Sequence, residues 1–457
     1  MKIIIVGCGK IGKTIISSLL KENHDVLAMD INPAVVEEVT NVYDVMGICG
    51  NGTEYETLKE AGVDKADIFV AATNSDEVNM LSCYVAHCMH AKHTIARIRN
   101  SGNNSVIGLA FMKKQLSLSL SINPELQAAK AIYNIIKLPS ATKVEMFSSN
   151  RFEMIELVLK EESHLDGMTL IDLRKNIKQN FLVCAVSRDG KVYIPQGNFK
   201  LKNGDKIGII ASGKDAPKLL KAFGVQHKPV HNVIIIGAGK TSTYLAEMLV
   251  EDKIGVNVIE IDEKRCTEMC EKVPSATVIH GNGMSQDVLL EEGVETVDAF
   301  VALTGRDEEN ILISFYAMSQ KNPKVICKVN GEELSDIAED LGLECIISPK
   351  KIIADIIVQY ARALKNSEGS KVEMLYSLLN GQIEALEFNV LPDFEFCNIP
   401  LKRLKFKDNV LLAGIVRGTE TIIPNGEDSI IAGDRVIIIA VGKTIYTLGD
   451  AIKETAK

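Results

Sequence analysis

The sequence predicts an α/β protein with two tandem Rossmann domains, each built on a doubly wound parallel sheet and each followed by a small β-rich α+β domain. Three observations lead to this prediction: the chain has 457 residues, it repeats itself once, and a glycine-rich turn follows an apolar strand in both copies. A chain of this length is expected to hold three or four domains of ordinary size. We place the expected boundaries at 1–140, 141–226, 227–368 and 369–457.

The repeat is visible when the sequence is aligned with itself. Ile3–Lys10 matches Val233–Lys240, and Glu60–Val63 matches Glu291–Val294 after one extra residue in the second copy. A match that persists over so many residues indicates a duplication. The chain is therefore expected to consist of two equivalent halves.

Within each copy, short apolar runs alternate with segments of helical periodicity. Val26–Met29, Ile68–Ala72 and Ile95–Ile98 have the composition of buried strands, whereas Asp76–His90 repeats its apolar residues at helical spacing. This alternation of strand and helix is typical of a parallel, doubly wound sheet.

The end of each copy has a different character. Runs such as Phe181–Val186 and Val436–Ala440 are β-rich, and turn signals such as Arg188–Gly190 and Asn425-Gly426 separate them from their neighbours. These stretches predict the two small β-rich domains.

Composition argues against several classes of function. The formal charge of −9 comes without a block of lysine or arginine, so nucleic acid is not an expected partner. No apolar run reaches 18 residues, and the N-terminus lacks the layout of a signal peptide. We therefore expect a cytoplasmic protein whose ten cysteines are reduced.

One cluster contains the residue types that bind metals: Cys83, His87, Cys88, His90 and His93. Cys83 and His87 are four residues apart on an expected helix, so they could share a zinc ion. Because the chain has no CxxC pair, we predict buried thiols here and no metal site.

The glycine-rich turn of the first copy fits the dinucleotide fingerprint G-x-G-x-x-G. Gly7 makes the tight turn, Gly9 lets the backbone approach a pyrophosphate, and Gly12 lets the helix pack closely on the strand. The expected cofactor-binding residues of the two loops are Gly7, Cys8, Gly9, Lys10, Ile11 and Gly12, and then Gly237, Ala238, Gly239, Lys240 and Thr241.

An acidic residue follows at the fingerprint distance in both copies. Asp30 comes directly after the strand Val26–Met29, where its carboxylate would accept hydrogen bonds from an adenosine ribose and repel a 2′-phosphate. Glu260 repeats it in the second copy. The cofactor is therefore predicted to be NAD, as NAD+ or NADH, rather than its phosphorylated form.

A rival interpretation is a P-loop NTPase, because Gly7, Gly12, Lys13 and Thr14 also satisfy G-x4-G-K-[ST]. The second copy decides against it, since Ser242 stands where the second P-loop glycine would be. We therefore expect Lys13 and Thr14 on the surface of a helix and predict no hydrolysis of a nucleotide. Ser242 also replaces the third dinucleotide glycine, so the second site is expected to bind more weakly or to prefer another adenine nucleotide.

With these features the chain resembles the TrkA family of Trk-type potassium-uptake regulators, which are built from tandem KTN (RCK-like) and TrkA-C domains. The resemblance covers essentially the whole chain, and it is most specific in Met1–Gly9, Ala71–Met80 and Ile95–Arg99. It implies that Thr73, Asn74 and Arg97 line the nucleotide crevice in the first copy, and Thr304 and Lys328 in the second. Gly305 and Lys328 depart from the first copy and put the selectivity of the second site in question.

The resemblance also implies a function. Members of this family form a cytoplasmic ring, here expected to be a homotetramer, at the inner face of the cell membrane on a separate Trk-type potassium-translocating subunit. NAD, and for either site ATP or ADP, would act as a signal that is not consumed.

The alternative is an NAD-dependent oxidoreductase, which Rossmann domains alone would favour. Its best candidate pair is Tyr133 and Lys137, spaced like the tyrosine and lysine of short-chain reductases. The second copy offers only Ala361 and Lys365 at the corresponding helix end. We therefore interpret Tyr133 as a packing residue and predict no catalytic residues.

Overall fold

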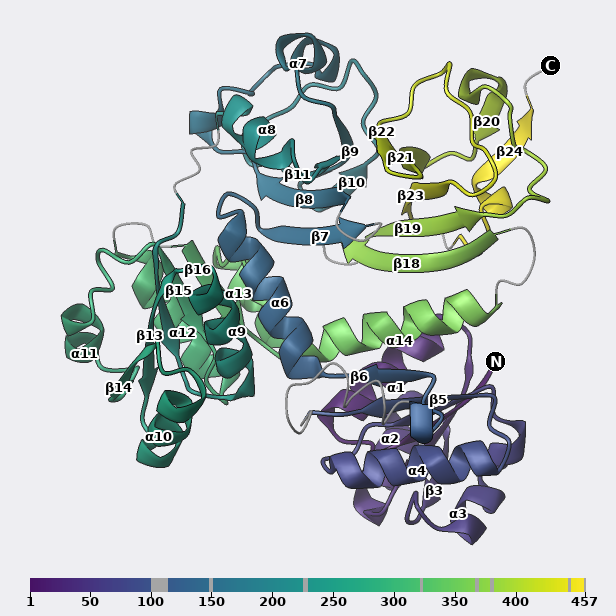
Figure 1. The fold of residues 1–457 in the computed structure, drawn as a ribbon, viewed down its shortest axis with the longest axis vertical. Coiled ribbons are helices and arrows are strands. Elements are labelled where there is room, and N and C mark those ends of the chain that lie inside the picture. The colour runs from purple at the N-terminus through teal and green to yellow at the C-terminus, as the bar shows by residue number, and fades with distance from the viewer. Residues whose placement is uncertain are drawn as a thin grey trace. The chain divides into compact units, whose positions relative to one another are not determined.

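The computed structural model describes residues 1–99, 114–147, 151–224, 229–320, 324–365, 370–378, 382–442 and 445–455. The chain forms two compact units (Figure 1). The first contains residues 1–128 and 348–361, and the second contains residues 129–347 and 362–457. In the described residues, each unit holds one six-stranded parallel sheet, and the second also holds two five-stranded antiparallel sheets and a two-stranded antiparallel sheet.

The parallel sheet of the first unit has the strand order β3-β2-β1-β4-β5-β6, which is the Rossmann order. Its strands are β1 (Lys2–Val6), β2 (Asp25–Asp30), β3 (Met46–Cys49), β4 (Ile68–Ala71), β5 (His93–Arg97) and β6 (Leu120–Ile122). Between these strands, the described residues form α1 (Lys10–Lys21), α2 (Pro33–Tyr43), α3 (Tyr55–Glu60), the 3-10 turn η1 (Val63–Lys65) and α4 (Asp76–Cys88), and residues 114 and 115 are also helical. The expected doubly wound fold is confirmed in this half.

Successive side chains of a strand point to opposite faces, so a strand with helices on both sides must be apolar throughout. Ile4 and Val6 of β1 pack in one cluster with Leu58 of α3 and Cys83 of α4. Ile5 is equally buried outside that cluster, as is Ile15 of α1. The continuous apolar run at the start of the chain therefore marks the centre of a sheet that is covered on both faces.

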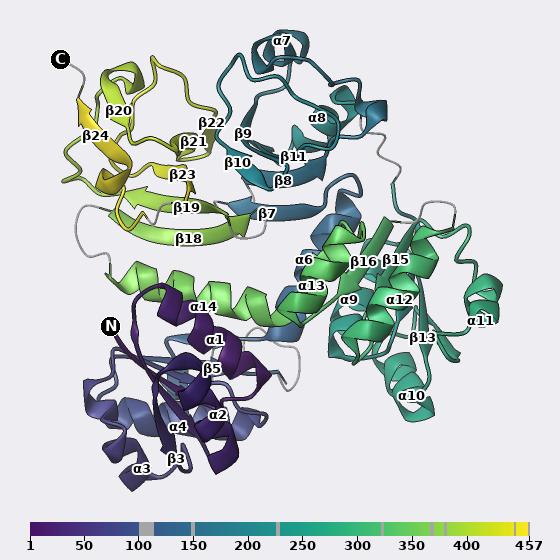
Figure 2. The same cartoon turned by 180° about the vertical axis from the view of Figure 1, so that it is seen from behind.

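The covering of this first sheet is completed by a helix from far along the chain. Residues 349–361 of α14 (Pro349–Lys365) belong to the first unit, and α14 lies along it in both views (Figure 1, Figure 2). Tyr360 donates its hydroxyl hydrogen to His93 Nδ1 or accepts from it at 3.0 Å, and the two rings meet edge to face. The helix that follows the second Rossmann sheet thus packs on the first.

The second unit repeats the Rossmann sheet in the order β14-β13-β12-β15-β16-β17. Its strands are β12 (Asn232–Ile236), β13 (Gly255–Glu260), β14 (Thr277–His280), β15 (Ala299–Ala302), β16 (Lys324–Lys328) and β17 (Ile346–Ile347). Its helices are α9 (Lys240–Glu251), α10 (Glu263–Lys272), α11 (Gln286–Glu291), α12 (Asp307–Met318) and α13 (Glu332–Asp340). The duplication predicted from the sequence is therefore a duplication of fold.

The helix that follows the first sheet, α6 (Pro124–Lys137), extends into this second unit from residue 129. Its last turn contacts the C-terminal end of α9 through Asp252. The segment after it also contacts the second sheet, because Lys324 at the start of β16 donates to the Ala141 carbonyl at 2.7 Å. The two Rossmann domains therefore exchange the helices that follow their sheets.

Two small domains with the same antiparallel topology complete the second unit. The first has the order β10-β9-β11-β8-β7, with β7 (Lys143–Phe147), β8 (Phe152–Val158), β9 (Phe181–Arg188), β10 (Lys191–Tyr193), β11 (Lys206–Ser212), η2 (Glu161–Ser163), α7 (Leu170–Asn176) and α8 (Ala216–Ala222). The second has the order β18-β19-β23-β21-β22, with β18 (Ser370–Leu378), β19 (Ile383–Val390), β21 (Val410–Arg417), β22 (Glu420–Ile422) and β23 (Arg435–Val441). Beside it lie η3 (Leu401–Arg403), β20 (Leu404–Phe406), η4 (Gly449–Ala451) and β24 (Ile452–Thr455). The predicted small β-rich α+β domains are confirmed.

The sheets of the two small domains share one apolar core. Phe152 and Met154 of the first domain pack in the same cluster as Ala385 and Ile437 of the second. The two domains thus form a pseudo-symmetric pair within one chain. In the described part of the chain, no helix combines the length and the apolar character that a membrane crossing requires.

Candidate functional site

The glycine-rich loop between β1 and α1 depends on glycine at two positions. Gly7 has φ +91°, and a Cβ placed on it would lie 2.7 Å from the Thr73 amide nitrogen. A Cβ on Gly12 would lie 2.0 Å from the Gly7 carbonyl oxygen. These distances are far below contact, so both positions require glycine if the loop is to pass close to β4 and the helix close to the loop.

Gly9 differs from Gly7 and Gly12, because a side chain at this position would not clash with the protein. It has φ −65° and ψ −168°, which other residues can adopt, and a Cβ placed on it would meet no atom within 4 Å. Gly9 is also the N-cap residue of α1 and has no side chain to cap the helix. The N-terminus of α1 therefore has no side-chain cap and has free space beside Gly9, two features that suit the binding of an anionic group.

Asp30 holds the loop from the end of β2. Its Oδ2 accepts the Cys8 amide hydrogen at 2.8 Å, and its Oδ1 accepts that of Asn32 at 2.9 Å. A carboxylate offers about four lone-pair sites, and half-buried Asp30 retains capacity for a further donor such as a ribose hydroxyl. Burial and the charge of Asp30 raise the pKa of the Cys8 thiol to about 12, so this cysteine is an inert part of the loop.

The turn after β4 is built around a buried amide, that of Asn79 on α4. Asn79 accepts the amide hydrogen of Thr73 at 2.8 Å and its hydroxyl hydrogen at 2.7 Å. It donates to the carbonyls of Thr73, at 3.2 Å, and of Arg97, at 2.9 Å. One side chain thus fixes the carboxyl ends of β4 and β5 against each other. The Asn74 carbonyl in the same turn accepts from Arg99.

Arg97 places a positive charge at this junction. Its Nη1 donates to the Thr73 carbonyl at 3.2 Å, and its Nη2 lies 3.7 Å from Glu125 Oε1. The side chain is mostly buried, and burial lowers the pKa of its guanidinium below the usual value. Among the residues described, none forms a hydrogen bond with its Nε. A buried guanidinium with unused hydrogen-bonding capacity is suited to a phosphate or amide group of a ligand.

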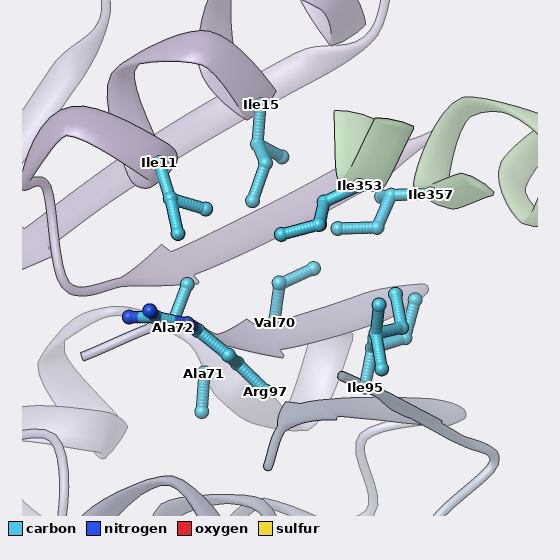
Figure 3. A pocket seen from close by; sticks show the side chains of 10 residues that line it. Ile11, Ile15, Val70, Ala71, Ala72, Ile95, Arg97, Ile353 and Ile357 are labelled. Carbon is cyan, nitrogen blue, oxygen red and sulfur yellow. The ribbon is translucent and has the colours of Figure 1, made fainter. Parts of the chain in front are cut away.

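The exchanged helix α14 forms a wall beside this arginine. Ile353 and Ile357 of α14 and Ile11 of α1 line a small apolar pocket that also includes Arg97 (Figure 3). Figure 3 shows the guanidinium of Arg97 beside Ala72, with Ile11 facing it from the glycine-rich loop. Ile11, within the glycine-rich segment, and two residues of the exchanged helix therefore line the same pocket.

The second site has the same plan. The Ala238 amide donates to Glu260 Oε2 at 2.7 Å, and Asn310 accepts from the Thr304 amide at 2.8 Å and donates to the Lys328 carbonyl at 2.9 Å. A Cβ on Gly239 would meet no atom within 4 Å. The predicted loop, carboxylate and strand-end residues are therefore brought together in both copies.

The carboxylate and the loop differ between the two sites. Glu260 is buried, and its other oxygen, Oε1, accepts the amide hydrogens of Ile261 and Asp262 at 2.9 and 3.0 Å. Three backbone donors thus occupy this carboxylate, where Asp30 has two. Ser242, at the position of Gly12, is completely buried, and no residue of the described chain forms a hydrogen bond with its hydroxyl. The second site therefore offers less to a ribose.

The cations of the second site are also weaker ligands for a phosphate. Lys328 replaces Arg97, and its Nζ donates to the Leu303 carbonyl at 3.3 Å. Asn330 replaces Arg99 and donates to Asp307. Two guanidinium groups of the first site thus become one ammonium and one neutral amide, which removes bidentate hydrogen bonding.

Residues of the rival interpretations lie elsewhere. Lys13 forms an ion pair with Glu38 of α2 on the outer surface. Tyr133 and Lys137 both contact Asp252. The Cys83 thiol donates to the Ile95 carbonyl. In the described ranges, no three His, Cys, Asp or Glu side chains are placed to hold a metal ion.

Sequence reasoning missed the two buried asparagines. Asn79 and Asn310 occupy equivalent positions of the repeat, six residues after Thr73 and Thr304. An asparagine at the same place in both copies of the repeat could have been noticed. The position of Ile353 beside the first site could not have been predicted from the sequence, because it depends on the exchange of helices.

Comparison with known proteins agrees with this architecture. The TrkA-N domain family matches residues 3–114 and 233–349, and the TrkA-C domain family matches residues 154–224 and 385–453. The chain is 30% identical over 442 residues to the Trk system potassium uptake protein TrkA homolog of Archaeoglobus fulgidus, with 96% of this chain and 97% of that protein covered. It is 28% identical over 448 residues to the Trk system potassium uptake protein TrkA of Halomonas elongata, with 97% and 96% covered.

A solved structure described as the GsuK channel bound to NAD shares the fold, with a TM-score of 0.63 and 16% identity over 96% of this chain and 77% of that chain. The resemblance noted from the sequence is thus confirmed over nearly the full length. The chain belongs to the TrkA family, with two TrkA-N and two TrkA-C domains in tandem.

Proposed function

We propose that this chain is a cytoplasmic regulatory subunit that binds NAD, as NAD+ or NADH, in its first crevice and thereby controls a Trk-type potassium-translocating membrane protein. The observation that carries the proposal is the geometry around Gly9. There is free space beside Gly9 at the uncapped N-terminus of α1. Asp30 accepts a hydrogen bond from the amide of Cys8 in the same loop, and Arg97 donates to the carbonyl of Thr73, whose amide lies close to Gly7.

Three groups of residues in the first crevice support the binding of a dinucleotide. The amides of the Gly7–Gly12 loop would hold the pyrophosphate, which gains from the positive end of the α1 dipole. Asp30 would accept the ribose hydroxyls on one side. Thr73 and Arg97 would orient the half that extends over β4 and β5.

Asp30 also supports the choice of NAD over its phosphorylated form. Both its oxygens are fixed by backbone donors, so the carboxylate cannot turn away from a 2′-phosphate. A negative charge held at that position repels a second one, and no arginine follows directly to receive a phosphate.

For the second crevice we propose weaker binding, or binding of ADP or ATP in place of NAD. The support is the occupied carboxylate of Glu260, the buried Ser242 and the loss of both strand-end arginines. An adenine nucleotide would depend on the loop amides around Gly239, where a Cβ would meet no atom within 4 Å, as at Gly9.

An oxidoreductase is the weaker alternative. The residues that it would need, Tyr133 and Lys137, are bound to Asp252 at the end of α9. That end is opposite to the glycine-rich loop from which α9 begins, so the pair cannot reach a nicotinamide in that crevice. In addition, the relatives from Archaeoglobus fulgidus and Halomonas elongata are named as potassium uptake proteins.

Regulation requires a partner and an assembly. We propose that four copies form a ring on the cytoplasmic face of the membrane protein, so that eight Rossmann domains act together. A nucleotide can shift such an assembly only through different affinities for its states, and the partner must then change nucleotide affinity in return, typically by about 1–3 kcal/mol.

The test is calorimetric titration of the intact chain with NAD+, NADH, NADPH, ADP and ATP, with NADH absorbance followed over the same period. We expect tight binding of NAD+ or NADH at one site per chain, weaker binding of NADPH there, and constant absorbance. Gly239→Asp should leave that site unchanged and remove any second one. Preferred binding of NADPH, or oxidation of NADH with a small carbonyl compound, would contradict the proposal.

A further inference from the structure

The two small domains carry one glutamate each at the same place in their sheets. Glu153 of β8 is paired in register with Met146 of β7 and with Ala211 of β11. Glu384 of β19 is paired with Ser377 of β18 and with Ala440 of β23. Since the two sheets have the same strand order, Glu153 and Glu384 are structural equivalents.

In the second repeat, this glutamate holds the end of the preceding helix. Arg362 of α14 donates through Nη1 and Nη2 to the two carboxylate oxygens of Glu384, each at 2.7 Å. Its side chain is 2% exposed and that of Glu384 is 24% exposed. Such a buried bidentate pair anchors α14 to the small domain that follows it.

In the structure, the equivalent of Arg362 in the first repeat is Lys137, which corrects the sequence-based correspondence of Lys137 with Lys365. Both α6 and α14 begin at a proline, and the two basic residues stand at the same distance from it. The buried faces agree in this alignment: Ala128, Ala129 and Ile132 of α6 correspond to Ile353, Ala354 and Ile357 of α14.

Lys137 nevertheless has a different partner. Its ammonium group is bound to Asp252, the residue after α9, together with the Tyr133 hydroxyl. The side chains of Lys137 and Asp252 are 48% and 33% exposed. An ion pair with that much exposure contributes about 0–1 kcal/mol and is readily broken.

Glu153 is left without the cation that its equivalent has. Within the described residues no lysine, arginine or histidine forms an ion pair with it, and its Oε2 is buried without a hydrogen-bond partner. Burial alone raises the pKa of its carboxyl group to about 6. The first small domain thus has a carboxylate at the position of Glu384, and no cation of the described chain is paired with it.

We propose that Lys137 exchanges between two carboxylates, those of Asp252 in the second Rossmann domain and Glu153 in the first small domain. It contacts Asp252 in this structure. Glu153 occupies the position in its sheet from which Glu384 binds Arg362 in the second repeat. The second repeat displays the arrangement that the first repeat can adopt. The end of α6 is thereby tied either to α9 or to its own small domain.

The exchange would connect the second crevice with a small domain. Asp252 follows the C-terminus of α9, and α9 begins at the second glycine-rich loop, so a ligand that moves α9 also moves the partner of Lys137. This consequence rests on the proposed function, whereas the exchange of Lys137 does not.

A double-mutant cycle on the intact chain tests the exchange by the sign of a stability change. In the wild type, Glu153→Gln replaces an unpaired, half-buried carboxylate, so the thermal midpoint should stay unchanged or rise. In Asp252→Asn, Lys137 has moved to Glu153, so the same Glu153→Gln change should lower the midpoint, by about 2 °C for a pair of this kind. Equal shifts in the two backgrounds would overturn the proposal.

A second readout follows Lys137 itself. Lysine acetylation measured by mass spectrometry should fall at Lys137 in Asp252→Asn, because the ammonium becomes covered, and should rise when Glu153→Gln is added. An increase in Lys137 acetylation in Asp252→Asn would overturn the proposal. The proposal would also fail if Asp252→Asn still reversed the sign of the Glu153→Gln effect on the thermal midpoint when Lys137 is replaced by methionine. Glu384→Gln is the matched control and should lower the midpoint in both backgrounds, because Arg362 is buried. No nucleotide or membrane protein is used, so failure here leaves the proposed function untouched.

Discussion

Gly9 is the position where one substitution should separate ligand binding from folding. Its backbone angles suit any residue and a Cβ on it would meet no atom within 4 Å, so Gly9→Asp can be built without moving the loop. The new carboxylate would lie at the N-terminus of α1, where a negative charge stabilises a helix by about 0.3–1 kcal/mol. The unliganded variant should therefore melt at or slightly above the temperature of the wild type.

The effect on binding should be large. The carboxylate would occupy the region where the pyrophosphate approaches the loop amides, and a charge about 5 Å from a phosphate costs about 3 kcal/mol at an effective dielectric constant near 20. This corresponds to a loss of affinity of at least about 100-fold, before the steric overlap is counted. Calorimetric titration with NADH measures the loss, and a melting curve without ligand measures the fold.

Gly12→Ala provides the contrast. Its Cβ would overlap the Gly7 carbonyl oxygen at 2.0 Å, so this smaller change should lower the melting temperature as well as the affinity. If Gly9→Asp bound NADH with undiminished affinity, or if it unfolded as Gly12→Ala does, the account of the glycine-rich loop would be refuted.

Further predictions concern the residues around the loop and the exchanged helix. Asp30→Ala should weaken NADH binding and bring the affinities for NADH and NADPH closer together, which competition titration measures; an unchanged ratio would show that Asp30 does not read the ribose. Asn79→Ala leaves the amide of the β4–α4 turn unpaired, so it should cost about 1–3 kcal/mol in denaturant unfolding and lower NADH affinity; loss of neither would refute its positioning role. Arg362→Ala should lower the free energy of unfolding by about 3–5 kcal/mol, because it leaves the partly buried carboxylate of Glu384 without its partner. A decrease below about 1 kcal/mol would contradict the buried ion pair. Iodoacetamide at pH 8 should alkylate the exposed Cys88 and not the buried Cys8, whose thiol stays protonated with a pKa of about 12. Alkylation of Cys8 detected by mass spectrometry would contradict its burial in the loop.

The parts of the fold set by local pattern could be predicted from the sequence. The glycine-rich turn and the acidic residue after the second strand identified the Rossmann sheet, because each of these positions has one geometric requirement. The strands that are buried on both faces read as apolar runs, and β4 (Ile68–Ala71) and β23 (Arg435–Val441) lie within one residue of their predicted bounds. The repeat then extended each conclusion to the second half.

The exchange of helices could not be predicted, because it is a choice between two similar surfaces. Ile353 and Ile357 of α14 present an apolar face that either Rossmann sheet could cover, and periodicity records the face but not its partner. The partner of Lys137 depends on the same choice. Buried asparagines such as Asn79 were missed for another reason, since a polar residue within a helix says nothing by itself about the strand ends that it joins.

The central claim is that a nucleotide held in the first crevice regulates potassium transport without being consumed. The most direct measurement is potassium flux in liposomes that contain a Trk-type membrane protein, with this chain added as wild type or as Gly9→Asp, while NADH is varied and its concentration is followed. We predict that flux depends on NADH with the wild type, that this dependence is lost with Gly9→Asp, and that NADH stays constant throughout. An equal response from both proteins, or oxidation of NADH in proportion to flux, would contradict the account.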